Sequence, residues 1–312
     1  MRKTSCNLSM KWMCQMLLVV TGILALAGPA LAQVAVIEAD TKPSPKPFDV
    51  ELGYGYQANT DLKKSSGDFH RNSFRGRLNA EISFSDTFKL DNIFVYENHN
   101  YTFSGNSPFQ WDSINRFMYA PLFKWRTSQQ WTLLAAPVVQ WTGESGAKAS
   151  KSFTGGGLVG FNYVASPTFS VGLLIGALSQ IEDKALVAPI PVINWKFAES
   201  WALRTGVISV GPTPGVGGEV GWKVAESVEL AGGLQFQRRR FRLDKNDAVG
   251  QEKMVPVYGK VTWWMFPQGA LEVFGSVATN GNLRLENKNG NKITDKDYDN
   301  TAFFGGKLHF IF

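Results

Sequence analysis

Cysteine is nearly absent from this sequence: Cys6 and Cys14 are the only two in 312 residues, and both lie close to the start of the chain. Residues 33–312 therefore have no thiol for a disulfide or a thiolate metal site. No cysteine follows the early apolar run either, so the signal for a lipid anchor is missing. The glycine triplet at residues 155–157 has neither a following helical pattern nor the Lys-Ser/Thr pair of a phosphate-binding loop. We predict that the protein holds no metal and no cofactor.

Excess charge of either sign is also scarce. The chain has 32 Lys and Arg against 26 Asp and Glu, and three of the basic residues lie within the first 32 positions. A nucleic-acid binding surface requires clustered positive charge well beyond this mild surplus. We therefore expect no nucleic-acid partner.

Long apolar runs are missing too. The run at residues 16–27 follows three basic residues and precedes Ala30-Leu31-Ala32, which is the pattern of a secretory signal peptide. This run is too short for a membrane-spanning helix, which needs roughly twenty residues, and no later stretch approaches that length. We predict that residues 1–32 are a cleaved signal peptide. The charged, proline-containing segment 33–47 is predicted to be an extended linker in the periplasm.

Strand patterning, in contrast, is abundant. Apolar and polar residues alternate with a period of two, and the chain contains 31 glycines and 13% aromatic residues. From residue 48 onward, short connections alternate with longer polar ones, as in bacterial outer-membrane barrels. We predict an all-β protein: a transmembrane, antiparallel, up-and-down β-barrel of about fourteen strands over residues 48–312. Twelve strands are the alternative, if the glycine-rich segments between residues 200 and 224 fail to pair.

The even number of predicted strands places both ends of the barrel on the short-turn side, which we assign to the periplasm. The predicted strands are residues 48–59, 73–84, 88–103, 114–125, 130–142, 153–164, 168–179, 186–197, 200–210, 217–224, 228–243, 254–265, 270–283 and 301–312.

Aromatic residues gather beside the short turns, for example Phe84, Phe88, Trp125 and Trp131. In an outer-membrane barrel such a belt lies at the interface between lipid and water. A second belt at the other interface would consist of Tyr54, Tyr56, Tyr96, Phe117, Trp141, Phe236 and Phe304. A β-sandwich whose turns are flanked by aromatics is the alternative, but the alternating connection lengths favour the barrel.

The last predicted strand has Leu308, Phe310 and Phe312 on one face and Lys307 and His309 on the other. Such a strand ending on an aromatic residue is typical of the signal read by the barrel assembly machinery. Together with the leader, the alternating connections and the belts, it resembles Gram-negative outer-membrane β-barrel proteins, especially porin-like families without a characterised function. The resemblance is architectural and transfers no functional residue. It implies a monomer in the cell outer membrane, with membrane lipids, lipopolysaccharide and the assembly machinery as partners.

Period two also places charged residues on the inner face of the predicted barrel, because Arg or Lys would cost roughly 2–4 kcal/mol each in lipid at the bilayer centre. The predicted lumen-lining residues are Arg75, Arg77, Glu81, Arg116, Arg204, Lys223 and Lys260. Basic residues outnumber acidic ones in this set, so we predict a passive pore for small hydrophilic solutes with a mild preference for anions. Alternatively, groups such as Arg75, Arg77 and Glu81 pair with one another and only solvate the wall.

Three segments are apolar on both faces: residues 130–139, 169–178 and 186–193. Pro137, Pro189 and Pro191 lie in them, where a strand ladder would need donors. Either these strands carry bulges, or part of the inner wall is apolar and packs against a plug or a hydrophobic ligand. The second explanation supports another function, a non-conducting barrel that binds a ligand or serves as a structural or surface-contact protein.

A basic run ends the predicted strand 228–243. Arg238, Arg239, Arg240 and Arg242 could bind the phosphates of lipopolysaccharide, because guanidinium groups bind phosphate bidentately. The alternative is a basic collar that reaches into the polar headgroup layer without a specific ligand.

One histidine, His99, lies near the outer end of the predicted strand 88–103, where a barrel-embedded hydrolase would place a general base. The serines considered beside it, Ser104, Ser107 and Ser113, lie in a loop without a nucleophile motif. We therefore predict that the protein is not an enzyme.

Overall fold

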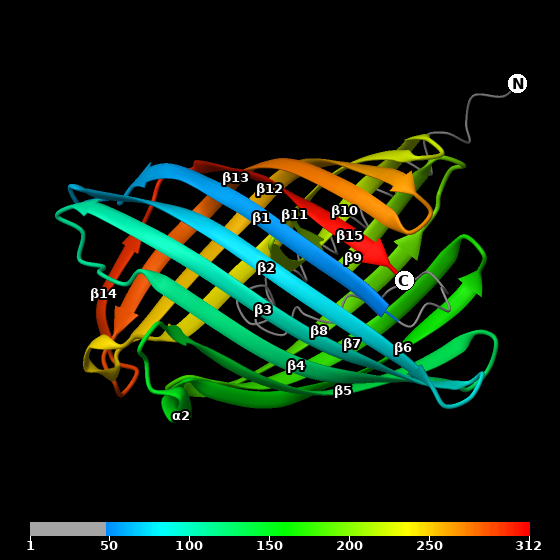
Figure 1. Ribbon diagram of the computed structural model, residues 1–312, viewed down its shortest axis with the longest axis horizontal. Coiled ribbons are helices and arrows are strands. Elements are labelled where there is room, and N and C mark those ends of the chain that lie inside the picture. Colours follow the sequence, from blue (N-terminus) through cyan, green and yellow to red (C-terminus); the bar gives the residue numbers. More distant parts are fainter. Residues whose placement is uncertain (1–47) are drawn as a thin grey trace, which may run out of the picture.

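The strands of this protein close into a barrel (Figure 1). The computed structural model describes residues 48–312, and the predicted signal peptide and linker lie outside the described residues. The strands are β1 Phe48–Asp61, β2 Gly67–Ser83, β3 Phe88–Gly105, β4 Ser113–Arg126, β5 Trp131–Glu144, β6 Phe153–Ser166, β7 Phe169–Gln180, β8 Asp183–Trp195, β9 Trp201–Val210, β10 Thr213–Ala225, β11 Val228–Arg242, β12 Val249–Phe266, β13 Gly269–Glu286, β14 Lys292–Asp297 and β15 Thr301–Ile311. Two short helical segments, α2 Ala149–Ser152 and η1 Lys245–Asp247, lie in connections. Within residues 48–312 no helix is long and apolar enough to cross a membrane.

Antiparallel pairing joins each strand from β1 to β13 to the next, and β15 pairs with both β13 and β1. The ring therefore closes with fourteen antiparallel strands, which confirms the predicted architecture. In the described part of the chain, β14 pairs with β13 alone and extends the connection between β13 and β15 as a hairpin. Twelve strands would require unpaired segments between residues 200 and 224, but β9 and β10 pair along their length.

Several strands extend farther at the long-loop end than predicted. β2 begins at Gly67, β10 at Thr213 and β12 at Val249. The ladder between β2 and β3, for instance, continues until Gly67 lies opposite Gly105. These extensions are largely polar, so hydrophobic periodicity gives no sign of them in the sequence.

The outer surface of the barrel is apolar. Leu78, Phe94 and Phe117 on β2, β3 and β4 have 41%, 47% and 55% of their surface exposed, while their chain neighbours Arg77 and Val95 are buried. A closed sheet satisfies its own main-chain hydrogen bonds, and an apolar outer band suits lipid. The protein is therefore built as an outer-membrane β-barrel.

Aromatic side chains contact one another near both ends of the strands. Beside the short turns, the ring centroids of Phe84 and Phe88 are 5.6 Å apart, and those of Trp201 and Trp222 are also 5.6 Å apart. Toward the long-loop end, Tyr56 lies 5.6 Å from Phe304. These are residues of the two predicted belts.

Buried apolar side chains form clusters inside the barrel. The inner apolar wall lies mainly on β3 to β8 and includes Ile93, Met118, Val138, Leu174, Ile190 and Val192. The mouth cluster lies at the long-loop end and includes Phe69, Tyr101, Phe109, Trp111, Phe241 and Tyr298. Strands that are apolar on both faces thus have a physical explanation, because one face meets lipid and the other forms the inner apolar wall.

Candidate functional site

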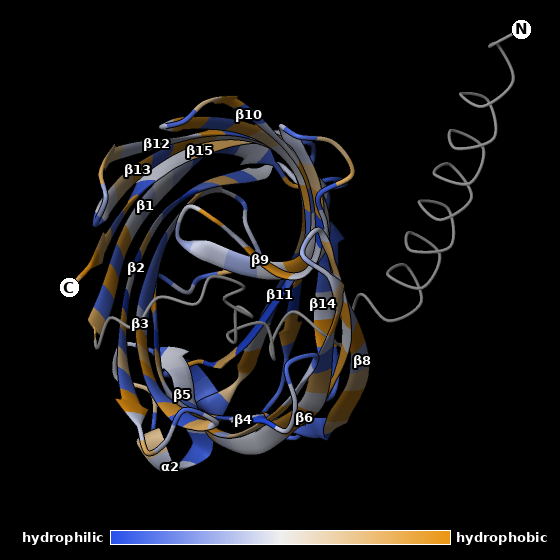
Figure 2. Ribbon diagram, turned by 90° about the vertical axis from the view of Figure 1, so that its right-hand side faces the viewer, coloured by the Kyte–Doolittle hydropathy of each residue, from blue (hydrophilic) through white to orange (hydrophobic). Residues whose placement is uncertain are grey.

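The hairpin of β9 and β10 folds into the lumen instead of continuing the wall. β8 and β9 pair through only three residue pairs, Ile193 to Trp195 opposite Leu203 to Thr205. The next residue, Gly206, has φ +122°, a conformation that glycine adopts readily and other residues rarely. Beyond it β9 leaves β8, and Figure 2 shows β9 inside the ring of strands.

The tip of this hairpin reaches the far side of the lumen. The Gly211 N–H donates a hydrogen bond to Glu272 Oε1 of β13 over 3.2 Å. A side chain at Gly53 of β1 would lie 3.2 Å from Gly211 and Pro212, so glycine there permits the close approach. Around the tip, Ile208, Val210, Tyr258, Phe274 and Phe303 form a buried apolar cluster. The hairpin therefore crosses the lumen and is held at both ends.

The inward fold leaves one edge of β8 unpaired. The Ile193 N–H donates to Thr205 Oγ1 over 3.0 Å, and Thr205 Oγ1 donates to the Pro191 carbonyl over 3.1 Å. In an antiparallel strand the N–H and C=O of one residue point to the same side, with a period of two. The ring nitrogens of Pro189 and Pro191 therefore face the unpaired edge of β8. Because proline has no N–H, these two positions leave no unpaired hydrogen-bond donor at that edge. We call this break in the hydrogen-bonded wall along β8 the lateral gap.

The basic run of β11 bounds the lateral gap at the long-loop end. Arg240 donates from Nε to the Ile181 carbonyl over 2.6 Å and from Nη2 to the Glu182 carbonyl over 3.2 Å. Arg238 Nη2 lies 3.4 Å from Asp183 Oδ2. These contacts join the end of β11 to the turn between β7 and β8. The guanidinium groups are thus engaged with this chain, and contact with lipopolysaccharide stays a prediction.

Charged side chains of the opposite inner wall are paired. The ion pairs include Arg75–Glu51 at 3.3 Å, Arg77–Glu51 at 3.0 Å, Arg116–Glu97 at 3.3 Å, Arg204–Glu219 at 3.0 Å and Lys260–Glu219 at 3.0 Å, and Arg204 also pairs with Glu229. Glu81 does not pair with Arg75 or Arg77 as considered from the sequence; it contacts Lys89 at 2.7 Å and Lys124 at 3.5 Å. Lys223 is exposed near the short-turn end, without an ion pair to another described residue. The wall is polar but largely charge-compensated.

One buried ionic centre was missed by the sequence analysis. Arg71 is 0% exposed and forms an ion pair with Glu252, which is 1% exposed. The same carboxylate accepts hydrogen bonds from Tyr101 Oη at 2.6 Å and Tyr298 Oη at 3.2 Å, and Arg239 Nη1 lies 2.7 Å away. The sequence signal was weak because Arg71 falls in a polar stretch that was interpreted as a loop.

The mouth cluster fills the long-loop end of the barrel. The connection between β3 and β4 brings Phe109 and Trp111 inward, with ring centroids 4.9 Å apart. Trp111 also packs 5.4 Å from Phe103 and 5.4 Å from Phe241. Aromatic packing of this kind excludes water, so the cluster acts as a plug.

His99 lies in the wall with a serine partner that the sequence analysis did not consider. Its Nδ1 is 2.9 Å from Ser73 Oγ, and its Nε2 is 3.6 Å from Glu97 Oε2. All three residues are at most 2% exposed, and the cavity beside His99 and Glu97 measures about 20 Å³. A site this small admits no organic substrate, so the arrangement is best explained as packing between adjacent strands.

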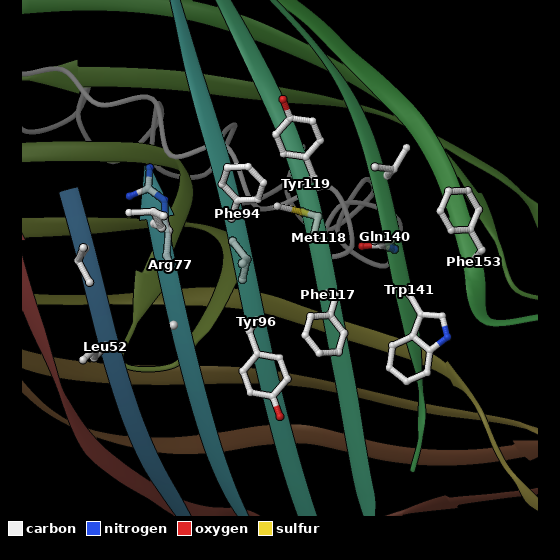
Figure 3. Close-up of a pocket in the computed structure, with 15 residues that line it drawn as sticks. Leu52, Arg77, Phe94, Tyr96, Phe117, Met118, Tyr119, Gln140, Trp141 and Phe153 are labelled. Carbon is white, nitrogen blue, oxygen red and sulfur yellow. The ribbon is translucent and has the colours of Figure 1, made fainter. Parts of the chain in front are cut away.

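An apolar groove of about 560 Å³ lies on the lipid-facing side of β1 to β6. Figure 3 shows Phe94, Tyr96, Phe117, Tyr119 and Trp141 side by side along it. Phe94 and Tyr119 are stacked 4.7 Å apart, and Tyr96 lies 4.8 Å from Phe117. Because the groove opens away from the lumen, we assign it to lipid chains and not to a solute path.

The chain resembles outer-membrane β-barrel channels. A channel from Pseudomonas putida F1 matches with a TM-score of 0.49 at 12% identity, over 89% of this chain and all (100%) of that one. A FadL homologue from Pseudomonas aeruginosa matches with a TM-score of 0.49 at 11% identity, over 92% and 96% of the two chains. The P. putida toluene transporter TodX gives 0.47 at 8% identity, over 86% and 91%.

No protein-family model matches the sequence, and no curated protein sequence matches it. At such low identities the likeness concerns the fold alone.

The predicted assembly residues lie at the seam of the barrel. Leu308 and Phe312 are 36% and 67% exposed, and the Phe312 N–H donates to the Phe48 carbonyl over 2.8 Å. Phe310 lies opposite both Val50 and Gly269. Their recognition by the assembly machinery stays a prediction.

Proposed function

We propose that this barrel is a channel for small molecules with a large apolar part, and that these molecules leave the lumen sideways through the lateral gap into the bilayer. The observation that carries the proposal is the unpaired edge of β8 beside the inner apolar wall. Ile190 and Val192 belong to that wall and also border the gap. An apolar surface therefore continues from the lumen toward lipid.

Energetics favour a sideways path over an axial one. Contact with an apolar wall stabilises an apolar solute by roughly 25 cal/mol per Å² removed from water. Straight passage is opposed at two levels, by the hairpin tip bound to Glu272 and by the plug that contains Trp111. A solute that leaves through the lateral gap does not have to pass the hairpin tip. It enters the lipid bilayer, where an apolar solute is more stable than in water.

A passive pore for small hydrophilic solutes with mild anion preference is the second candidate. Exposed Lys223 favours it, because its positive charge lies near the short-turn end without an ion pair to another described residue. The compensating ion pairs weaken this candidate, since paired charges set up only a small field in the lumen.

We further propose that the short turns and both ends of the barrel face the periplasm, after export with cleavage of residues 1–32. Outer-membrane lipids would then surround the apolar band, and lipopolysaccharide would surround the long-loop end. We propose that the barrel is monomeric and not an enzyme.

The test uses purified protein in planar bilayers and in lipid vesicles. The probe is N-phenyl-1-naphthylamine, an apolar amine whose fluorescence rises when it enters lipid. We expect the protein to speed transfer of the probe across a lipopolysaccharide-containing leaflet without a steady ohmic current. A steady current with no faster transfer would contradict the lateral path and support the hydrophilic pore.

A further inference from the structure

A second cavity, of about 700 Å³, lies on the outer side of the plug. It is enclosed by the connection between β3 and β4, the segment around α2, the connection between β11 and β12 and the hairpin of β13 and β14. Its volume falls within the range of small-molecule sites in proteins. We call it the mouth cavity.

The floor of the mouth cavity is apolar and belongs to the plug. Trp111, Leu243, Ala248 and Leu285 line the cavity and also belong to the mouth cluster or pack against it. Ile293 of β14 adds an exposed aliphatic side chain to the lining. Trp111 is 2% exposed, and its Nε1 has no hydrogen-bond acceptor among the described residues. An apolar body can therefore rest on this floor.

Two of the three acidic residues of the rim, Asp247 and Glu144, form hydrogen bonds with other groups of this chain. Asp247 Oδ2 lies 2.7 Å from Lys151 Nζ and 3.1 Å from Lys148 Nζ, and these hydrogen bonds hold the pKa of Asp247 below its ordinary value. Glu144 accepts the main-chain N–H groups of Asp112 at 3.1 Å and Asp244 at 2.9 Å. The Asp244 carboxylate lies against Gly146, and neither Asp244 nor Glu144 forms an ion pair with another described residue.

Two lysines of the rim have no acidic partner among residues 48–312. Lys245 Nζ donates to the neutral Gln110 Oε1 over 3.3 Å, and Lys288 makes no ion pair there. Four lysines (Lys148, Lys151, Lys245 and Lys288) stand against three acids (Glu144, Asp244 and Asp247), so the rim carries one net positive charge. Lysine ammonium groups on flexible stems suit an anionic oxygen group of a ligand.

We infer that the mouth cavity is a capture site for small amphipathic carboxylates, whose apolar body lies on the floor while the carboxylate binds Lys245 and Lys288. The inference rests on the proposed function and adds the substrate class: the transported molecule has an apolar body and one anionic head. Because the floor is part of the plug, a bound molecule touches Trp111 and Leu243 directly. Capture and opening of the plug are then coupled through the same side chains.

Binding of 1-naphthylacetate to the purified barrel tests this, with 2-(1-naphthyl)ethanol as the uncharged analogue of the same body. Replacing both lysines, Lys245→Gln with Lys288→Gln, should weaken binding of the acid by about three- to tenfold, as expected for exposed ion pairs, and leave the alcohol unchanged. Lys184→Gln, at the same end of the barrel but outside the cavity, is the matched control and should change neither. Ile293→Asn should weaken both ligands.

Equal binding of acid and alcohol, or an unchanged acid affinity in the double lysine variant, would overturn the inference. Measuring transfer of the naphthylamine probe separates a failure of the capture site from a failure of the proposed lateral channel. If the acid binds as expected but the naphthylamine probe is not transferred, the capture site stands and the lateral channel falls. If the probe is transferred and the acid does not bind, the channel stands and the capture site falls.

Discussion

The ionic centre below the plug gives the sharpest stability prediction. Glu252 is 1% exposed and pairs with Arg71, which is 0% exposed. Removing one partner of such a buried pair leaves the other charge uncompensated, which costs about 3–5 kcal/mol. Glu252→Gln should therefore lower the free energy of unfolding of the barrel by about that amount. Tyr101 donates to Oε2 and Tyr298 to Oε1, so glutamine keeps an acceptor for only one of them and the variant loses one acceptor together with the charge.

A double-variant cycle separates the interaction between Arg71 and Glu252 from other destabilising effects of each substitution. Arg71→Met combined with Glu252→Gln should be less destabilising than the sum of the two single variants by about 2 kcal/mol or more, because no buried Arg71 charge is left unpaired. Urea unfolding in lipid, followed by gel mobility of folded and unfolded protein, measures all three. The control Asp299→Asn removes a pair with Lys63 that is 3.7 Å long and exposed on both sides, and should cost at most about 1 kcal/mol. A Glu252→Gln variant as stable as the parent, or strictly additive single effects, would refute the reasoning.

Other consequences concern gating, selectivity and assembly. Gly53→Val places a branched side chain where a Cβ would already lie 3.2 Å from Pro212 of the hairpin tip, so the tip should be displaced. In a Trp111→Ala background, where the plug is also loosened, planar-bilayer current should then rise above that of Trp111→Ala alone, and an unchanged current would contradict the contact. In that conducting background, the double variant Arg75→Ser with Arg77→Ser should shift ion selectivity toward cations, because the negative charge of their carboxylate partners is no longer neutralised. A reversal potential that does not move would count against a role of these arginines in selectivity. Deleting Phe312 should lower the amount of protein in the outer membrane while the signal peptide is still cleaved, and normal insertion would argue against the assembly signal.

Strand number and topology were predictable because lipid imposes a strict pattern. Outward residues such as Leu78 and Phe94 must be apolar, and the short turns are easily recognised between aromatic pairs such as Phe84 and Phe88. The inward fold of β9 and β10 was not predicted, because apolar residues such as Val207, Ile208 and Val210 suit a strand that faces lipid as well as one inside the lumen. Signals for it existed in Pro189 and Pro191, which remove two N–H donors from one edge of β8, and in Gly206.

Charge pairing was harder to predict than charge placement. Period two places Arg75 and Arg77 on the inner face, but their acidic partners come from neighbouring strands whose register the sequence does not fix. Glu51 meets both arginines because β1 and β2 align Glu51 with Arg77. Likewise the mouth cavity unites four connections that are far apart in sequence, and no single motif marks it.

The lateral gap is the central claim, and blocking it is the direct test. Ala188 lies on the inner side of β8 beside the unpaired edge and is 1% exposed, while Ala136 lies on the same inner apolar wall, on β5, and is 2% exposed. Tryptophan at either position overpacks the wall, at a cost of about 1–3 kcal/mol, but only Ala188→Trp should obstruct the gap. We predict that Ala188→Trp abolishes protein-dependent transfer of N-phenyl-1-naphthylamine into the bilayer and that Ala136→Trp retains it. Equal transfer by the two folded variants would contradict a sideways path.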